Sequence, residues 1–215
     1  MVLMRRLGGL LAGAALALLA GGAGAHDGVV HQTPADAQAH LKASPNTPGF
    51  PTDIGGPFRL IDQFGRKRTE VDPDGHYQLI FFGYASCKAI CSVALPSMAD
   101  AVDLLEKDGI VVTPVLITVD PERDTIRAMR KAAPAIHPRM VGLTGSERAL
   151  RKAYTAFRME KKLVMDHPTE GPIYAHGSFV YLMGPDGSFR TVLPPILAPE
   201  RMADVVEGYV RTVTN

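Results

Sequence analysis

Cys87 and Cys91 are the only two cysteines of the chain, and three residues separate them. They follow the apolar run 79–82 and stand at the head of a stretch with helical character. A separation of four places both side chains on one face of a helix, one turn apart. Two thiols at that spacing can close a disulfide or hold one soft metal ion. A purely structural disulfide is the simpler alternative, although a bridge across so small a loop removes little entropy from the unfolded chain.

His176 adds a third soft ligand to this pair. It directly precedes an expected strand over 178–182, and a residue at the head of that strand can reach the rim of the sheet where the cysteines lie. Two thiolates and one imidazole make a site that suits copper. Without the cysteines, the simpler interpretation of His176 is a surface histidine or one whose hydrogen bonds are satisfied.

Other histidines offer weaker candidates. After cleavage behind Ala25, His26 would carry the free amine and His31 would lie close to it, so this tail could chelate Cu(II). A solvated tail without a metal role is the alternative. His167 falls in an expected loop near His176 and is a reserve ligand. The histidines that we expect to be ordinary surface residues are His40, His76 and His137.

Residues 1–25 have the pattern of a secretory signal peptide. Arg5 and Arg6 precede the apolar run 7–20, and residues 23–25 form a small-residue cleavage site. An uncleaved membrane anchor is the alternative, whereas a bacterial lipoprotein is excluded because no cysteine follows the apolar run. Export leads to the periplasm, or to a membrane-anchored protein that faces it, and a Cys87–Cys91 disulfide is then expected when metal and reductant are absent.

The rest of the chain divides into two parts. Residues 26–57 are rich in proline and lack apolar periodicity, which indicates a flexible tail or linker. Residues 58–215 are expected to form one domain, and the hydrophobic content of 46% is ordinary for a globular protein. The formal net charge of +1 gives no indication of nucleic-acid binding.

The order of elements predicts an α/β protein with a thioredoxin-like fold, in which helices flank a central sheet and a C-terminal β-hairpin and helix follow. Asp120 is expected to cap a helix that starts at Pro121, and not to take part in the chemistry. The two long strands should be parallel neighbours, with the cysteines where the first of them meets its helix. The expected strands are 58–61, 77–83, 110–119, 140–143, 178–182 and 188–192, and the expected helices are 94–107, one from 121, 146–157 and 200–210.

Three segments of the chain resemble the Sco/SenC family. They are FFGYASCKAIC at 81–91, TVDPERDT at 118–125, and His176 leading into YLMGPDG at 181–187. The family consists of exported or membrane-tethered copper proteins with a thioredoxin fold, which help to load the binuclear copper centre of cytochrome c oxidase. The similarity runs from about Phe58 to the C-terminus. It implies that Cys87, Cys91 and His176 are the copper ligands.

The chain also departs from the family pattern near these ligands. Family members usually carry a proline and an acid between the cysteines, a proline after the second cysteine, and an acid before the histidine. This chain has Lys88 to Ile90, Ser92 and Ala175 at those places. The missing acid could remove a group that orients the histidine. Lys88 should favour the Cys87 thiolate and lower its pKa.

Two functions follow from these residues. The first is a non-enzymatic metallochaperone that carries Cu(I) or Cu(II) and hands it to the copper-receiving subunit of cytochrome c oxidase, with an upstream copper donor and a thiol reductant as further partners. The second is a thiol-disulfide oxidoreductase in which Cys87 attacks and Cys91 resolves. His176 favours the first, because a pure dithiol enzyme has no use for it.

Overall fold

The computed structural model describes residues 53–169 and 171–213, which belong to a compact unit beginning at Phe50. The signal, most of the predicted tail, and His26, His31 and His40 therefore lie outside the described residues. Within the described part, no helix has both the length and the apolar character needed to cross a membrane.

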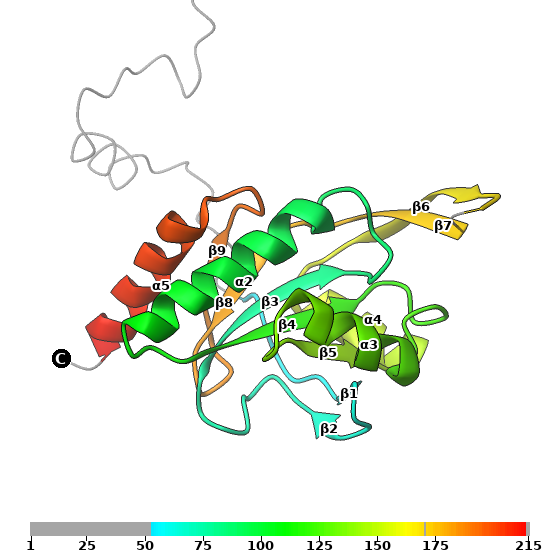
Figure 1. The fold of residues 1–215 in the computed structure, drawn as a ribbon. Coiled ribbons are helices and arrows are strands. Elements are labelled where there is room, and N and C mark those ends of the chain that lie inside the picture. The colour runs from blue at the N-terminus through cyan, green and yellow to red at the C-terminus, as the bar shows by residue number, and fades with distance from the viewer. Residues whose placement is uncertain (1–52, 170, 214–215) are drawn as a thin grey trace, which may run out of the picture. The chain divides into compact units, whose positions relative to one another are not determined.

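A seven-stranded mixed sheet forms the centre of the domain, as Figure 1 shows. Its strands, in spatial order, are β2 (Lys67–Arg68), β1 (Leu60–Asp62), β5 (Val141–Thr144), β4 (Val112–Thr118), β3 (Tyr77–Gly83), β8 (Val180–Met183) and β9 (Phe189–Leu193). The central strands β3, β4 and β5 are parallel, and β8 runs antiparallel to β3. The predicted parallel pairing of the two long strands is thus confirmed.

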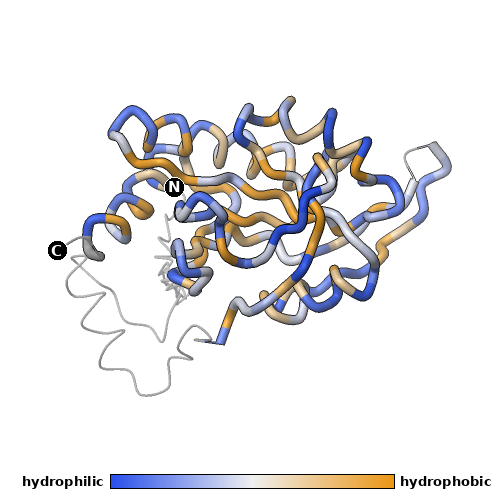
Figure 2. Tube along the Cα trace, turned by 90° about the horizontal axis from the view of Figure 1, so that it is seen from below, coloured by the Kyte–Doolittle hydropathy of each residue, from blue (hydrophilic) through white to orange (hydrophobic). Residues whose placement is uncertain are grey.

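Helices cover both faces of this sheet. They are α2 (Cys91–Lys107), α3 (Ile126–Ile136), α4 (Glu147–Ala156) and α5 (Pro199–Val213). One apolar cluster joins α2, α3 and α5 to one face, and a second joins α4 and the segment before β1 to the other. Figure 2 shows the hydrophobic residues following the central strands, with hydrophilic residues on the outer turns. This confirms the thioredoxin-like α/β fold, including the C-terminal hairpin β8–β9 followed by α5.

The expected helix start at Asp120 is wrong. Residues 121–124 form turns, and α3 begins at Ile126 after Thr125, whose hydroxyl accepts from the backbone N–H of Ala128. The Asp120 carboxylate pairs with Arg123 instead of capping a helix. A charged partner three residues away therefore replaces the capping interaction.

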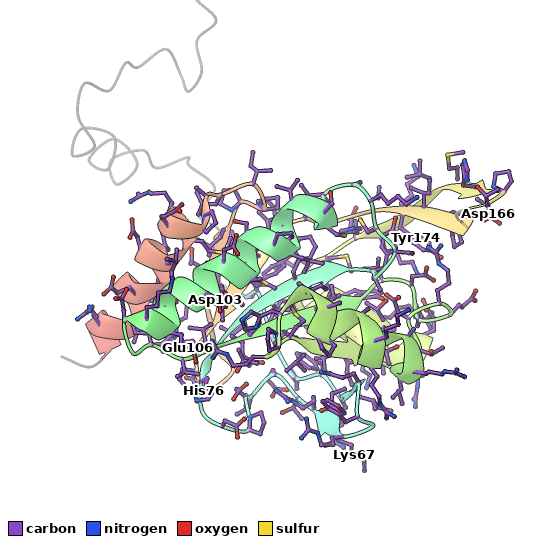
Figure 3. All side chains as sticks on the ribbon, in the orientation of Figure 1. Lys67, His76, Asp103, Glu106, Asp166 and Tyr174 are labelled. Carbon is purple, nitrogen blue, oxygen red and sulfur yellow. The ribbon has the colours of Figure 1, made fainter. Side chains whose placement is uncertain are left out.

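A two-stranded hairpin that the sequence did not predict projects from the sheet. It consists of β6 (Lys161–His167) and β7 (Gly171–His176), drawn in yellow in Figure 1. Figure 3 labels Asp166 near its tip and Tyr174 closer to the body of the domain. The side chains of Leu163, Val164 and Met165 are about half exposed, so the hairpin has no buried face. His176 is the last residue of this hairpin, not the head of the next strand.

Candidate metal centre

Cys87, Cys91 and His176 lie together at one edge of the sheet. One ligand atom from each is within 4.8 Å of the other two. Cys91 is buried, whereas Cys87 and His176 are partly exposed. The three residues proposed from the sequence thus meet, although they come from a loop, a helix start and a hairpin end.

Cys87 does not lie on the helix, contrary to the sequence-based expectation. The helix α2 starts at Cys91, and Cys87 belongs to the loop that leaves β3. The backbone N–H of Cys87 donates to the carbonyl of Tyr84 at 3.0 Å, which folds this loop into a turn. The turn satisfies the local backbone groups and leaves the Cys87 side chain more exposed than that of Cys91.

Gly83 makes room for the buried sulfur. A Cβ atom at this position would lie 3.0 Å from Cys91 Sγ and 3.0 Å from Phe81 Cε1. Real Cβ atoms rarely approach other heavy atoms so closely, so any side chain here would displace the sulfur or the ring. The end of β3 therefore depends on glycine for the placement of Cys91.

The ring of His176 is oriented for metal binding. Its Nδ1 lies 3.0 Å from the carbonyl oxygen of Gly177, and because a carbonyl only accepts, Nδ1 carries the proton. Nε2 is the ring nitrogen left to face the thiols, and it lies 3.9 Å from Cys91 Sγ. Phe81 and Tyr84 pack against the ring edge to face, with centroids 6.0 and 6.2 Å away. A hydrogen bond on the far nitrogen is the usual device that fixes a ligating histidine.

The two thiols have different acidities. A hydrogen bond from the Cys91 thiol lowers the pKa of Cys87 to about 4; burial acts against this effect, and a hydrogen bond with His176 assists it. The same bond to Cys87 raises the pKa of Cys91, together with burial. The predicted lowering for Cys87 is confirmed in direction, and its largest cause is Cys91. Cys87 is thus the thiolate of the pair, and Cys91 stays protonated beside it.

Arg123 joins the parts of the site, and sequence reasoning did not identify it. Its Nη2 donates to the carbonyl of Pro172 on β7 at 2.7 Å, and its guanidinium lies 5.5 Å from the ring centroid of Tyr84. Asp120 holds the same guanidinium by an ion pair. Arg123 lies in the segment TVDPERDT at 118–125, whose likeness to the family is the signal that could have identified it.

Asp124 anchors the loop that carries Cys87. Its Oδ2 accepts from the backbone N–H of Ala85 at 3.0 Å and from the hydroxyl of Thr118 at 2.7 Å. Burial raises the pKa of this carboxyl. The loop after β3 is therefore fastened to the end of β4.

The other histidines of the described residues do not join this centre. His167 pairs with Gly171 at the opposite end of the hairpin, five strand residues from His176, which is about 17 Å. Its expected role as a reserve ligand is therefore wrong. His137 is buried, not on the surface, and its Nε2 lies 3.0 Å from Asp103 Oδ1.

His76 lies in a second group of close ligand atoms, with Asp72 and Asp74. There Asp72 Oδ1 accepts from the backbone N–H of Asp74 at 2.9 Å. This is the local bonding of a turn, so the group gives no separate reason to expect a metal.

A groove gives access to the thiols. It has a volume of about 340 Å³ and is lined by both cysteines, by the end of α3, and on α2 by Leu95, Pro96, Ala99 and Asp100. Ala135 and Ile136 form its far wall. A partner can therefore approach the sulfurs from the side of the helices.

The sequence profile of the SCO1/SenC family matches residues 46–211. The chain is 34% identical over 166 residues to "Protein SCO2 homolog, mitochondrial" of Danio rerio, an alignment that covers 73% of this chain and 57% of that protein. It is 35% identical over 137 residues to a SCO2-like protein of Rickettsia prowazekii, covering 63% of this chain and 67% of the relative. The chain thus spans little more than half the length of the first of these relatives.

Solved structures agree with these matches. The copper-bound crystal structure of ScoI from Arabidopsis thaliana superposes with a TM-score of 0.67 and 31% sequence identity. The alignment covers 74% of this chain and 99% of that one. The matched region contains the segments that carry Cys87, Cys91 and His176.

Proposed function

The chain belongs to the SCO1/SenC family, and on that basis we propose that it is an exported copper chaperone for cytochrome c oxidase. It would carry one copper ion on Cys87, Cys91 and His176 as cargo. The observation that carries this proposal is the mutual approach of the three ligand atoms within 4.8 Å. An ion placed among them can reach two sulfurs and one imidazole nitrogen.

The donor set fits copper in both oxidation states. Thiolates are soft ligands that favour Cu(I), and the imidazole extends the site towards Cu(II). The orientation of His176 supports this assignment, because Nδ1 makes the hydrogen bond to the backbone and leaves Nε2 on the side of the sulfurs. Cys91 releases its proton when the metal binds, since thiolate is the ligand form.

Transfer would take place by ligand exchange through the groove. Cys87 is the more exposed sulfur, so an incoming ligand of the partner meets it first. The acceptor would be the copper-receiving subunit of cytochrome c oxidase, and an upstream donor would reload the site. A thiol reductant must first supply two electrons and two protons to any Cys87–Cys91 disulfide.

Export would follow from residues 1–25, as a cleaved signal or as an anchor that faces the periplasm. Residues 26–57 would be the tether, and residues 58–215 the copper-binding domain. The compact unit itself starts at Phe50, before that boundary, and Ile54 is part of its core.

The second candidate is a thiol-disulfide oxidoreductase. The unequal thiols favour it, because a partly exposed Cys87 of lowered pKa suits an attacking thiol and a buried Cys91 of raised pKa suits a resolving one. In this reaction the Cys87 thiolate attacks a partner disulfide, and Cys91 then displaces the partner thiol and closes the Cys87–Cys91 bond.

Recovery of a copper oxidase in cells that lack the protein tests the proposal. A chaperone requires both sulfurs, so Cys87→Ser and Cys91→Ser should fail alike, and excess copper should partly restore the oxidase. A covalent adduct that accumulates only in Cys91→Ser, without rescue by copper, would overturn the chaperone in favour of the oxidoreductase.

A further inference from the structure

A cationic pocket lies apart from the metal centre, between the segment before β1 and the first turns of α4. It has a volume of about 510 Å³, and Arg59, Arg148 and Lys152 line it together with Pro57 and Ser146. All three cationic side chains are exposed. Like charges gathered around one hollow raise its affinity for anions.

These three cations have no acidic partner within the described residues, whereas most other arginines there do. The arginines within 4.0 Å of a carboxylate are Arg66, Arg68, Arg123, Arg139, Arg151, Arg158, Arg190, Arg201 and Arg211. Two acids next to lining residues have other partners. Glu147 pairs with Arg151 at 3.4 Å, and Glu70 accepts from the backbone N–H of Phe58 at 3.2 Å.

We propose that this pocket binds the phosphate groups of anionic phospholipids and docks the domain on a membrane surface. The start of α4 adds to the attraction, because the backbone N–H groups of a helix N-terminus favour phosphate. Exposed cations around an open pocket suit the headgroup layer of a membrane. A site for one small anion would instead surround that anion with buried hydrogen-bond donors. Each basic residue near an anionic membrane strengthens the contact about fivefold.

The position of the pocket in the chain supports a lipid as its occupant. Pro57 and Arg59 lie close to the start of the described part at Asp53, and the first 25 of the 52 preceding residues are expected to be a signal or an anchor. A tether over residues 26–52 would have a root-mean-square reach of about 30 Å. An anchored domain would therefore stay within reach of the headgroups.

Docking would also orient the metal centre. The strands β3 and β5 are both parallel to β4, so their carboxyl ends share one edge of the sheet. Cys87 follows β3 at that edge, and the first turn of α4 follows β5 there. A domain that contacts lipid through this turn would hold its thiols near the bilayer. The docking proposal itself does not depend on copper.

Hydrogen exchange of the full chain in lipid nanodiscs tests the docking. Residues 57–59 and 146–152 should exchange more slowly in discs that contain phosphatidylglycerol than in pure phosphatidylcholine discs. The double variant Arg148→Gln/Lys152→Gln should weaken binding to the phosphatidylglycerol discs by about 25-fold and abolish the protection. The matched control is Arg127→Gln/Lys131→Gln, which removes two exposed cations that are also four residues apart but belong to α3. This control should keep the protection.

Three results would overturn the proposal. The first is equal hydrogen exchange of residues 57–59 and 146–152 in the two kinds of disc, or a loss of protection in the control double variant as large as in Arg148→Gln/Lys152→Gln. The second is protection by free inorganic phosphate in phosphatidylcholine discs but none by phosphatidylglycerol, which would assign the pocket to a small anion. The third is protection only on addition of polyglutamate, which would assign it to an acidic protein. Circular dichroism should show both double variants folded, because their side chains are exposed.

Discussion

Nη2 of Arg123 lies 2.7 Å from the carbonyl oxygen of Pro172, and this contact ties the segment after β4 to the strand that ends in His176. The two residues are 49 positions apart in the chain. The guanidinium also faces the ring of Tyr84, which precedes the cysteine loop. One side chain thus connects the elements that supply the sulfurs and the nitrogen of the proposed site.

Arg123→Ala should therefore weaken Cu(II) binding by about 10- to 100-fold, the usual effect of losing a group that orients a ligand. Cu(I) binding should change less, because the two sulfurs remain. Isothermal competition titration measures both affinities. Arg151→Ala is the control, since it removes an exposed arginine that pairs only with Glu147 within the described residues. An unchanged Cu(II) affinity in Arg123→Ala would show that Arg123 does not position the copper ligands.

Gly83→Ala should destabilise the fold by about 1–3 kcal/mol and lower copper affinity, because the new methyl group collides with Cys91 Sγ. Denaturant unfolding and copper titration give the two quantities. Gly208→Ala in α5 is the control, because a Cβ there meets no heavy atom within 4 Å and should stabilise the helix by about 0.5–1 kcal/mol. A stable Gly83→Ala variant with normal copper affinity would contradict the packing argument.

Alkylation of the reduced, metal-free protein should modify Cys87 first and should stay fast as the pH falls to about 6. The thiolate is the reactive form, and the lowered pKa of Cys87 keeps that residue in the thiolate form at about pH 6. In an ordinary thiol with a pKa near 8.5, the thiolate fraction falls about tenfold for each pH unit below the pKa. Cys91→Ala removes the hydrogen-bond donor and should restore the ordinary pH dependence. Mass spectrometry of iodoacetamide-treated protein follows the rate. A steep fall below pH 8 in the unmodified chain would show that the thiolate is not stabilised.

Oxidation of Cys87 and Cys91 to a disulfide should abolish copper binding and leave the fold intact. A disulfide has no thiolate to offer, and the bridge joins residues that are already neighbours. Far-UV circular dichroism should be unchanged, and copper uptake should return with a reductant. If the oxidised protein binds copper with the same affinity, the ligands lie elsewhere, and His26 and His31 become the candidates.

The sequence predicted most of the fold, because apolar runs and turn residues report buried strands and their connections. The strands β3 and β4 are fully apolar over most of their length, and Gly184 to Gly187 marks the turn between β8 and β9. The hairpin β6–β7 escaped prediction because neither strand has a fully buried side chain, and so neither shows an alternation of buried apolar residues. Local pattern alone does not report such pairing.

The sequence predicted which residues form the candidate site, but it did not predict the contacts that hold them in place. The chemistry of two thiols and an imidazole is readable from the sequence. The start of α2 at Cys91 depends on turn bonds around Tyr84, and the role of Arg123 depends on a contact across 49 residues. Interactions of that range leave no periodic signal in a single sequence.

The most direct test of the three-ligand site is titration of the reduced full chain with Cu(I) and with Cu(II), with the metal counted per chain. The site described here predicts one copper per chain, a large loss of Cu(II) affinity in His176→Ala and a much smaller loss of Cu(I) affinity. His167→Ala, at the other end of the same hairpin, should bind both ions normally. Equal loss of both oxidation states in His176→Ala, or no loss of either, would contradict the assignment of Cys87, Cys91 and His176 as the copper site.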